Sequence, residues 1–192
     1  MTKIYKITTI VTIVFSLFCT VLCNSSFTSD IASEEPPIET DSKIKYSNFF
    51  KEKKHWCNTM VITCSDFRYT EATHELINNR LGLIGDYDYF SIPGSIRNLL
   101  DSSTREIVLD TFGISVRLHH VKDIIIISHQ DCMGYGGSGA FETKEEEKKK
   151  ICKDLKKARW RMQMKFRKQV YLYYGSEQYE GDKKIYYFEQ IL

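Results

Sequence analysis

Two short segments of the sequence carry side chains that could hold a metal ion. Residues Cys64–Arg68 follow a short apolar run, and residues His129–Cys132 follow four consecutive isoleucines. Two thiolates and one imidazole are a common ligand set for catalytic zinc, which keeps its fourth position open for water. The His-x-x-Cys spacing lets both side chains of one turn reach a single ion. The pattern therefore predicts a Zn²⁺ site made of Cys64, His129 and Cys132.

Two further residues of the first segment suit the chemistry of water bound beside such an ion. Asp66 and Arg68 lie two and four residues beyond Cys64, so in an extended chain all three side chains would project to the same side. An arginine fork would keep the Asp66 carboxylate ionised and fix it as a hydrogen-bond acceptor. We therefore predict that Arg68 holds Asp66 as an ionised acceptor beside the metal-bound water.

The elements that must position these segments alternate between strand and helix. Four consecutive isoleucines indicate a strand buried on both faces, as in a parallel sheet covered by helices. Asp101 is a good N-cap for the helix that follows it. We expect strands over residues 60–63, 88–92, 123–128, 170–174 and 185–188, and helices over 70–81, from Asp101 to 118, and 145–168. This order predicts an α/β fold with a largely parallel sheet flanked by helices, whose ligands bind beyond the carboxyl ends of the strands.

Length and charge limit the domain organisation and the class of partner. The chain has 192 residues, of which 42% are hydrophobic and 27% charged, as in one folded domain with an extension. A formal net charge of only +2 argues against nucleic acid as a partner.

The first 45 residues differ in composition from the rest. Lys3 and Lys6 precede an apolar run of about 24 Å as a helix, too short for the ~30 Å hydrocarbon core. We interpret residues 1–23 as a cleaved signal peptide, 24–45 as a flexible linker and 46–192 as the zinc domain. This predicts an exported protein, periplasmic or secreted, with no stable membrane span after cleavage. If residues 1–23 were not cleaved, they would tether the protein to the membrane.

The two segments together resemble the signature of the β-class carbonic anhydrases. The Cys-x-Asp-x-Arg pattern is followed by His-x-x-Cys, and the strand-turn from Tyr87 to Gly94 is similar to that of a carbonic-anhydrase-like subgroup. The likeness covers about residues 58–160. By this resemblance, the β-carbonic-anhydrase-like fold would hold zinc on Cys64, His129 and Cys132, with Asp66 and Arg68 as the catalytic pair. Family members generally form homodimers or larger homo-oligomers.

The resemblance also implies an activity. It predicts a carbonate dehydratase, a zinc lyase that hydrates carbon dioxide reversibly to bicarbonate by attack of zinc-bound hydroxide. The carbon dioxide would lie in an apolar pocket near Phe67 and Phe90, with Asp66 as the acceptor of a hydrogen bond from the hydroxide.

Departures from the family pattern keep two alternatives open. Met133 follows Cys132 where the family usually has glycine, and Pro93-Gly94 stands in place of an Arg-Asn-Ala-Gly type stretch. The first alternative is therefore a catalytically silent zinc-binding or bicarbonate-sensing module of the same fold. The second is a thiol-redox protein that uses Cys64 or Cys132.

Other features have simpler interpretations. Residues 134–139 spell G-x-G-x-x-G but lie beyond the predicted metal turn, so we expect a flexible loop beside the zinc site and not a nucleotide site. His119 and His120 end a helix, where a cation suits the helix dipole. Cys57 and Cys152 are expected to be peripheral, and could pair in an oxidising compartment.

Overall fold

A five-stranded sheet forms the centre of the domain. The computed structural model describes residues 55–192, so the predicted signal peptide and linker lie outside the described residues. The strands are β1 (Thr59–Thr63), β2 (Tyr87–Ser91), β3 (Asp123–His129), β4 (Gln169–Glu180) and β5 (Lys183–Gln190), in the sheet order β2-β1-β3-β4-β5. Neighbouring strands are parallel except β4 and β5, which are antiparallel. The predicted α/β fold with a largely parallel sheet is confirmed.

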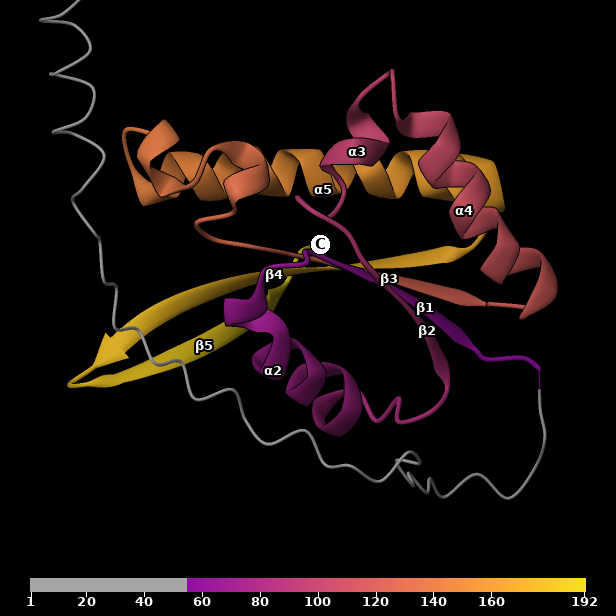
Figure 1. Cartoon of the computed structure of the whole chain (residues 1–192), viewed down its shortest axis with the longest axis horizontal. Coiled ribbons are helices and arrows are strands. Elements are labelled where there is room, and N and C mark those ends of the chain that lie inside the picture. The colour runs from indigo at the N-terminus through magenta and orange to yellow at the C-terminus, as the bar shows by residue number, and fades with distance from the viewer. Residues whose placement is uncertain (1–54) are drawn as a thin grey trace, which may run out of the picture. The chain divides into compact units, whose positions relative to one another are not determined.

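Helices cover both faces of this sheet. The α-helices are α2 (Phe67–Glu75), α3 (Arg97–Leu100), α4 (Arg105–Leu118) and α5 (Lys144–Phe166), with a π-helical turn η1 (Leu76–Arg80) after α2 and 3-10 turns η2 (Met133–Tyr135) and η3 (Ser138–Ala140) before α5. Helices α3, α4 and α5 lie against one face, and α2 lies against the other (Figure 1). No helix within residues 55–192 is both long and apolar enough to cross a bilayer.

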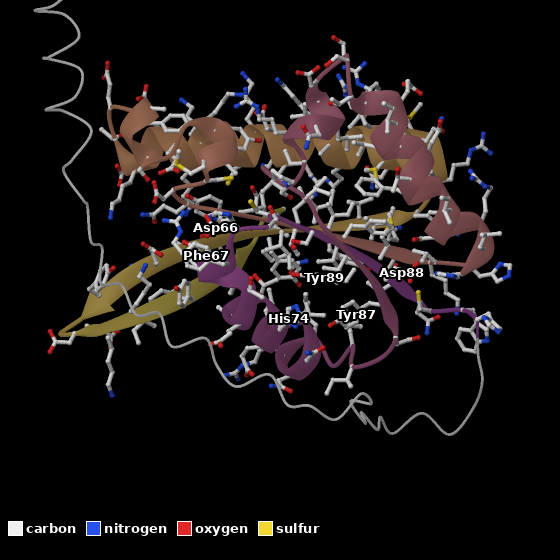
Figure 2. All side chains as sticks on the ribbon, viewed as in Figure 1. Asp66, Phe67, His74, Tyr87, Asp88 and Tyr89 are labelled. Atoms are coloured by element: carbon white, nitrogen blue, oxygen red, sulfur yellow. The ribbon has the colours of Figure 1, made fainter. Side chains whose placement is uncertain are left out.

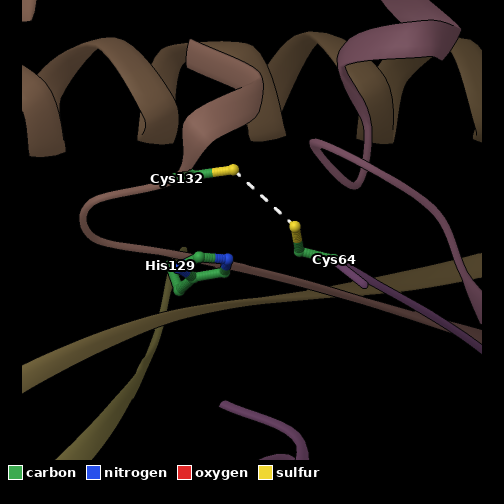
Figure 3. Close-up of side chains that lie close together, drawn as sticks. All are labelled: Cys64, His129 and Cys132. Carbon is green, nitrogen blue, oxygen red and sulfur yellow. Dashed lines mark hydrogen bonds between the residues drawn. The ribbon is translucent and has the colours of Figure 1, made fainter. Parts of the chain in front are cut away.

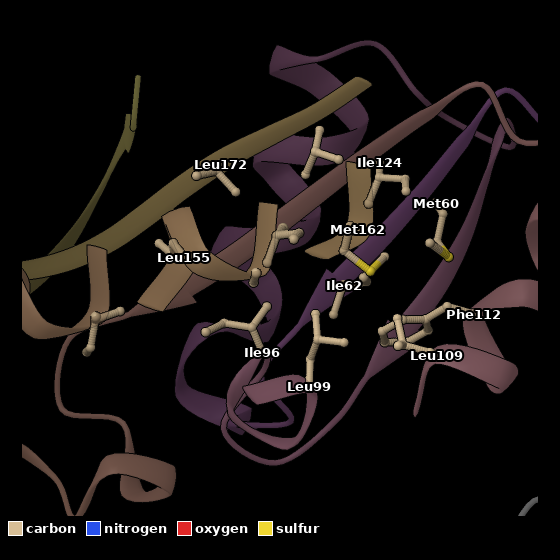
Figure 4. Close-up of a cluster of buried hydrophobic side chains, with 14 of the residues drawn as sticks. Met60, Ile62, Ile96, Leu99, Leu109, Phe112, Ile124, Leu155, Met162 and Leu172 are labelled. Atoms are coloured by element: carbon tan, nitrogen blue, oxygen red, sulfur yellow. The ribbon is translucent and has the colours of Figure 1, made fainter. Parts of the chain in front are cut away.

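The isoleucines of β3 point alternately into two hydrophobic clusters. Ile124 and Ile126 pack in the larger cluster, on the side of α4 and α5 (Figure 4). Ile125 and Ile127 pack in the smaller cluster with Leu76 of η1. Burial of both faces is what the run of isoleucines predicts, and it fixes the end of β3 within the sheet.

The start of α4 differs from the prediction. Asp101 ends α3, and its carboxylate accepts hydrogen bonds from the backbone N and the hydroxyl of Ser103 at 2.8 and 2.6 Å. This local turn uses the Asp101 carboxylate, so α4 begins only at Arg105, with Thr104 in the N-cap position. The prediction that Asp101 caps α4 is therefore wrong.

Strands β4 and β5 are longer than the aromatic segments, 170–174 and 185–188, from which they are predicted. Strand β4 continues to Glu180 and pairs with β5 as a hairpin whose turn contains Gly181, with a φ of 60°. The residues added beyond the predicted strands are mostly polar and are exposed or half-buried, and they gave no alternating hydrophobic signal. Pairing between the strands, rather than burial, extends them.

Candidate metal centre

The three predicted zinc ligands meet at the carboxyl edge of the sheet. Cys64 directly follows β1, His129 is the last residue of β3, and Cys132 lies in the turn beyond it. Because β1 and β3 are parallel neighbours, both ends reach the same edge. The two Sγ atoms lie 3.8 Å apart, and one ligand atom from each residue lies within 4.8 Å of the others (Figure 3). These residues could therefore hold one metal ion.

The imidazole of His129 is oriented as a metal-binding histidine requires. Its Nδ1 donates a hydrogen bond to the carbonyl of Gln130 at 2.6 Å, which leaves Nε2 as the unprotonated nitrogen. The ring stacks on Tyr69 with centroids 4.2 Å apart. Nε2 is buried and has no hydrogen-bond partner among the described residues. A buried lone pair without a partner carries a desolvation cost, and a metal ion bound here would remove that cost.

The two thiols form a pair of unequal acidity. The hydrogen bond from the Cys132 thiol lowers the pKa of Cys64 to about 4 against the opposing effect of burial. Cys132 is fully buried, and the adjacent Cys64 sulfur raises its pKa. A divalent cation would stabilise both residues as thiolates. Together with the buried Nε2 of His129, this donor set fits Zn²⁺.

Asp66 and Arg68 form the ion pair that the sequence predicts, through a different geometry. The prediction of an extended chain is wrong because Asp66 is the N-cap of α2 and accepts from the backbone N of Arg68. The Arg68 guanidinium also binds both Asp66 carboxylate oxygens, at 2.9 and 2.5 Å. These hydrogen bonds keep the pKa of Asp66 below its usual range. The Asp66 Oδ2 atom lies 3.9 Å from His129 Nε2, so the ion pair borders the candidate metal centre.

Arg68 has a second partner that sequence reasoning missed. Its guanidinium donates to Asp131 at two points, to Oδ2 at 2.6 Å and to the backbone carbonyl at 2.9 Å. Asp131 lies between the two turn ligands with a φ of 55°, a conformation in which aspartate is enriched among non-glycine residues. Arg68 therefore connects the Asp66 cap to the turn that carries His129 and Cys132.

Glu147 of α5 holds the same turn through hydrogen bonds. Its carboxylate accepts from the backbone N of Asp131 and from the hydroxyl of Ser138, both at 2.6 Å. The backbone N of Ser138 in turn donates to the Asp131 carboxylate at 2.8 Å. Glu147 is fully buried, although its Lys- and Glu-rich surroundings indicate a solvated helix face. No sequence signal separated Glu147 from its exposed neighbours.

Gly94, which belongs to one departure from the family pattern, makes a close backbone contact with Gly134. A Cβ added to Gly134 would lie only 2.4 Å from the Cα of Gly94, so the two glycine backbones touch behind the metal turn. Met133 begins η2 and its side chain is exposed. Gly134 thus supplies the close approach, one residue after the position where a glycine is usual. The predicted loop over 134–139 lies beside the site and overlaps the 3-10 turns η2 and η3.

The predicted apolar pocket is not formed by the two phenylalanines. Phe67 is the first residue of α2 (Figure 2), and 84% of its surface is exposed. It borders an open, partly polar hollow of about 710 Å³ with Arg68 and Tyr186. Phe90 packs edge-on against Phe112 in the larger hydrophobic cluster. The prediction for Phe67 is therefore wrong.

The cysteines and histidines outside this centre lie at other places in the fold. The four cysteines within residues 55–192 are free thiols, so Cys57 and Cys152 are not bonded. His119 is the C-cap of α4, as its helix-end position indicates, but its Nδ1 also donates to Asp88 at 2.7 Å. Cys57 lies close to this pair. The sequence gave no signal that these three residues meet.

Comparison with known proteins places the chain in a family. A model of the family described as "Putative carbonic anhydrase" matches residues 54–180, which include every residue of the candidate metal centre. The chain belongs to this family. An uncharacterized protein of Rickettsia conorii is 31% identical over 130 residues, covering 65% of this chain and 69% of that protein. An uncharacterized protein of Rickettsia bellii is 32% identical over 130 residues, covering 65% of this chain and 79% of that protein.

Proposed function

We propose that the protein is a zinc-dependent carbonate dehydratase that converts carbon dioxide and water reversibly into bicarbonate and a proton. The observation that supports this most directly is the buried Nε2 of His129, which has no hydrogen-bond partner within residues 55–192 and faces two cysteine sulfurs in a chain of the carbonic anhydrase family. An unfilled buried acceptor at the end of a strand is expected where a metal ion completes the site.

Cys64, His129 and Cys132 would hold the zinc. Three protein ligands leave one coordination position for water, as in other catalytic zinc sites. When bound, zinc supplies Lewis acidity that lowers the pKa of water from 15.7 towards ~7. The remaining chemistry depends on the residues around this position.

Asp66 would orient the attacking water. Arg68 keeps the Asp66 carboxylate ionised, so the carboxylate acts only as an acceptor. Oδ1 of Asp66 accepts from both the backbone N and the Nε of Arg68, whereas Oδ2 accepts one bond from Arg68 and keeps a further lone pair free for water. A hydrogen bond from the water to Asp66 would direct the oxygen lone pair towards the carbon of carbon dioxide. The new C–O bond gives bicarbonate, and the proton released passes to buffer.

Arg68 and Asp131 would act as positioning residues. Their hydrogen bonds connect the Asp66 cap to the His129–Cys132 turn, so movement of one would displace the other. Such a link holds the acceptor and the ligands at a fixed separation, which is the main contribution that positioning makes to rate.

Metal analysis combined with a hydration assay tests the proposal. The full chain, loaded with zinc, should hydrate carbon dioxide in stopped flow faster than buffer containing free zinc. Cys64→Ser should lose both the zinc of this centre and the activity. Cys152→Ser, which changes a cysteine of α5 outside the ligand set, is the matched control and should keep both. Hydration at full rate by Cys64→Ser without this zinc would refute the proposal, and bound zinc without activity would favour the silent zinc-binding module.

A thiol-redox function is the second candidate, and the 3.8 Å separation of the Cys64 and Cys132 sulfurs is the observation that favours it. This function predicts that alkylation inactivates the protein equally with and without metal. The zinc enzyme predicts protection, because thiolates bound to zinc react slowly with alkylating reagents. Mass spectrometry of the alkylated protein, with and without zinc, separates the two candidates.

A further inference from the structure

A second group of metal-binding side chains lies outside the centre described above. Cys57 precedes β1, Asp88 is the second residue of β2, and His119 caps the end of α4. The backbone N of Cys57 donates to the carbonyl of His119 at 3.0 Å, which fixes the start of β1 against the end of the helix. One donor atom from each of the three side chains lies within 4.8 Å of the others.

This cluster, Cys57–Asp88–His119, is remote from the first centre. Because β1 and β2 are parallel, the residues before β1 and at the start of β2 share the amino end of the sheet, opposite to Cys64 and His129. Asp66 and Asp88 lie at opposite ends of the strands in Figure 2. A ligand bound at the cluster would therefore not touch the proposed catalytic residues.

We propose that Cys57, Asp88 and His119 bind a divalent transition-metal ion of the Zn²⁺ type. A thiolate sulfur, an imidazole nitrogen and a carboxylate oxygen are all donors that zinc accepts, and three of them leave the fourth position for water. The Cys57 side chain is buried, whereas the side chains of Asp88 and His119 are 22% and 43% exposed. The site is therefore closed to solvent at Cys57 and open at Asp88 and His119, where an ion can enter.

The charges around the cluster favour a cation. The Asp88 carboxylate lies beside the Cys57 sulfur and supplies a negative charge that attracts a cation. Binding would release the thiol proton to buffer and place the positive ion between the sulfur and the carboxylate. Asp86 adds a further negative charge nearby, where its carboxylate accepts hydrogen bonds from the backbone and side chain of Asn58.

A nucleophilic Cys-His-Asp triad is the competing explanation, and the geometry argues against it. In a triad the imidazole lies between the thiol and the carboxylate and lowers the pKa of the thiol. Here the Cys57 thiol donates to the carbonyl of Thr59 and lies next to Asp88, whose carboxylate raises its pKa. The thiol is thus not activated as a nucleophile, although it can bind a metal.

Metal counting on the full chain tests this site independently of the proposed function. Purified protein is stripped of metal and titrated with Zn²⁺ in competition with a chromophoric chelator. Cys57→Ser and His119→Ala should each bind one Zn²⁺ fewer per chain than the wild type, and Cys64→Ser should lose a different one. A variant that combines Cys57→Ser with Cys64→Ser should lose both. Carbon dioxide hydration by His119→Ala should stay within about twofold of the wild type, since distant sites act independently.

Cobalt provides a second readout that depends on the sulfur. In a Cys64→Ser/Cys132→Ser background, Co²⁺ should produce a thiolate-to-cobalt absorption band, and Cys57→Ser should abolish it. Circular dichroism identifies any variant that has failed to fold, and His119→Ala, which changes a partly exposed side chain, serves where Cys57→Ser does not fold. An unchanged zinc count in folded His119→Ala, or a cobalt band that persists without Cys57, would overturn the proposal.

Discussion

The carboxyl and amino ends of the parallel strands each carry a cluster of metal-binding side chains. The two clusters differ in whether their ligand atoms already have hydrogen-bond partners. At the carboxyl end, His129 Nε2 is buried without a partner, and the two sulfurs lie side by side. At the amino end, His119 and Asp88 already satisfy each other through a hydrogen bond of 2.7 Å. An ion at the carboxyl end would satisfy a group that lacks a partner, whereas an ion at the amino end must replace an existing bond.

This difference indicates which cluster should bind metal more tightly. A buried acceptor without a partner costs roughly 1–3 kcal/mol, and metal binding would recover that free energy at His129. At the amino end, the bond between His119 and Asp88 must first be broken. We therefore expect zinc to occupy the carboxyl-end centre first, and the following predictions test that order.

Removal of zinc should have the largest effect. A ligand present at a thousand times its dissociation constant stabilises the folded state by about 4 kcal/mol, so a chelator should lower the free energy of unfolding by roughly that amount. Urea unfolding of the wild type with and without zinc measures the change. In Cys64→Ser, zinc removal should cause only a small part of this loss in the free energy of unfolding. In Cys57→Ser, it should cause most of the loss. Equal losses in the two variants would contradict the proposed order of affinity.

The two aspartates beside the clusters should differ sharply in their effect on rate. Asp66→Asn removes the charge that Arg68 holds and that would orient water, so hydration should fall by about a hundredfold or more, or about 2.7 kcal/mol of barrier. Asp88→Asn, the matched change at the amino end, should leave the rate within about twofold. Stopped-flow hydration measures both variants after their zinc content is known. If Asp66→Asn keeps zinc and full activity, the carboxyl-end residues have been assigned the wrong role.

The backbone contact between Gly134 and Gly94 at the carboxyl end should be sensitive to added volume. Gly134→Ala would place a methyl group 2.4 Å from the Cα of Gly94, where only backbone could move to relieve it. We expect a loss of about 1–3 kcal/mol in the free energy of unfolding, as for other overpacked positions. Gly139→Ala, in the same loop with nothing within 4 Å of the new methyl, should change it by less than about 0.5 kcal/mol. Similar values for both variants would show that the Gly94 contact tolerates the added volume.

The same two ends show what the sequence could predict. The carboxyl-end ligands follow strands whose burial is visible as runs of apolar residues, and parallel strands bring their ends to one edge. The motif and the sheet together were enough to place Cys64, His129 and Cys132 near one another. The ion pair of Asp66 with Arg68 was also predicted, although a helix cap and not an extended strand creates it.

The amino-end cluster, and Glu147 that holds the metal turn, could not be predicted from the sequence. Cys57 precedes β1, Asp88 lies in β2 and His119 ends helix α4, and packing rather than local pattern brings these three places together. Glu147 has the same helix-forming, charged surroundings as its exposed neighbours, and only tertiary contact with the Asp131 turn buries it. For Phe67 the error is the reverse, because a residue predicted to line an apolar pocket is exposed. The orientation of a helix start decides whether its first side chain is buried, and the sequence does not show that orientation.

The smallest expected effect concerns the bond between Asp88 and His119. Both side chains are partly exposed, so without metal a double-mutant cycle of Asp88→Asn and His119→Gln should give a coupling free energy of about 0.2–1 kcal/mol. In the presence of zinc the coupling should increase, because each single variant then removes a ligand from the same ion. Urea unfolding of the four proteins, with and without zinc, measures both values. A coupling that zinc does not change would mean that the amino-end pair is only a surface ion pair, and the carboxyl end would then be the metal-binding end of this sheet.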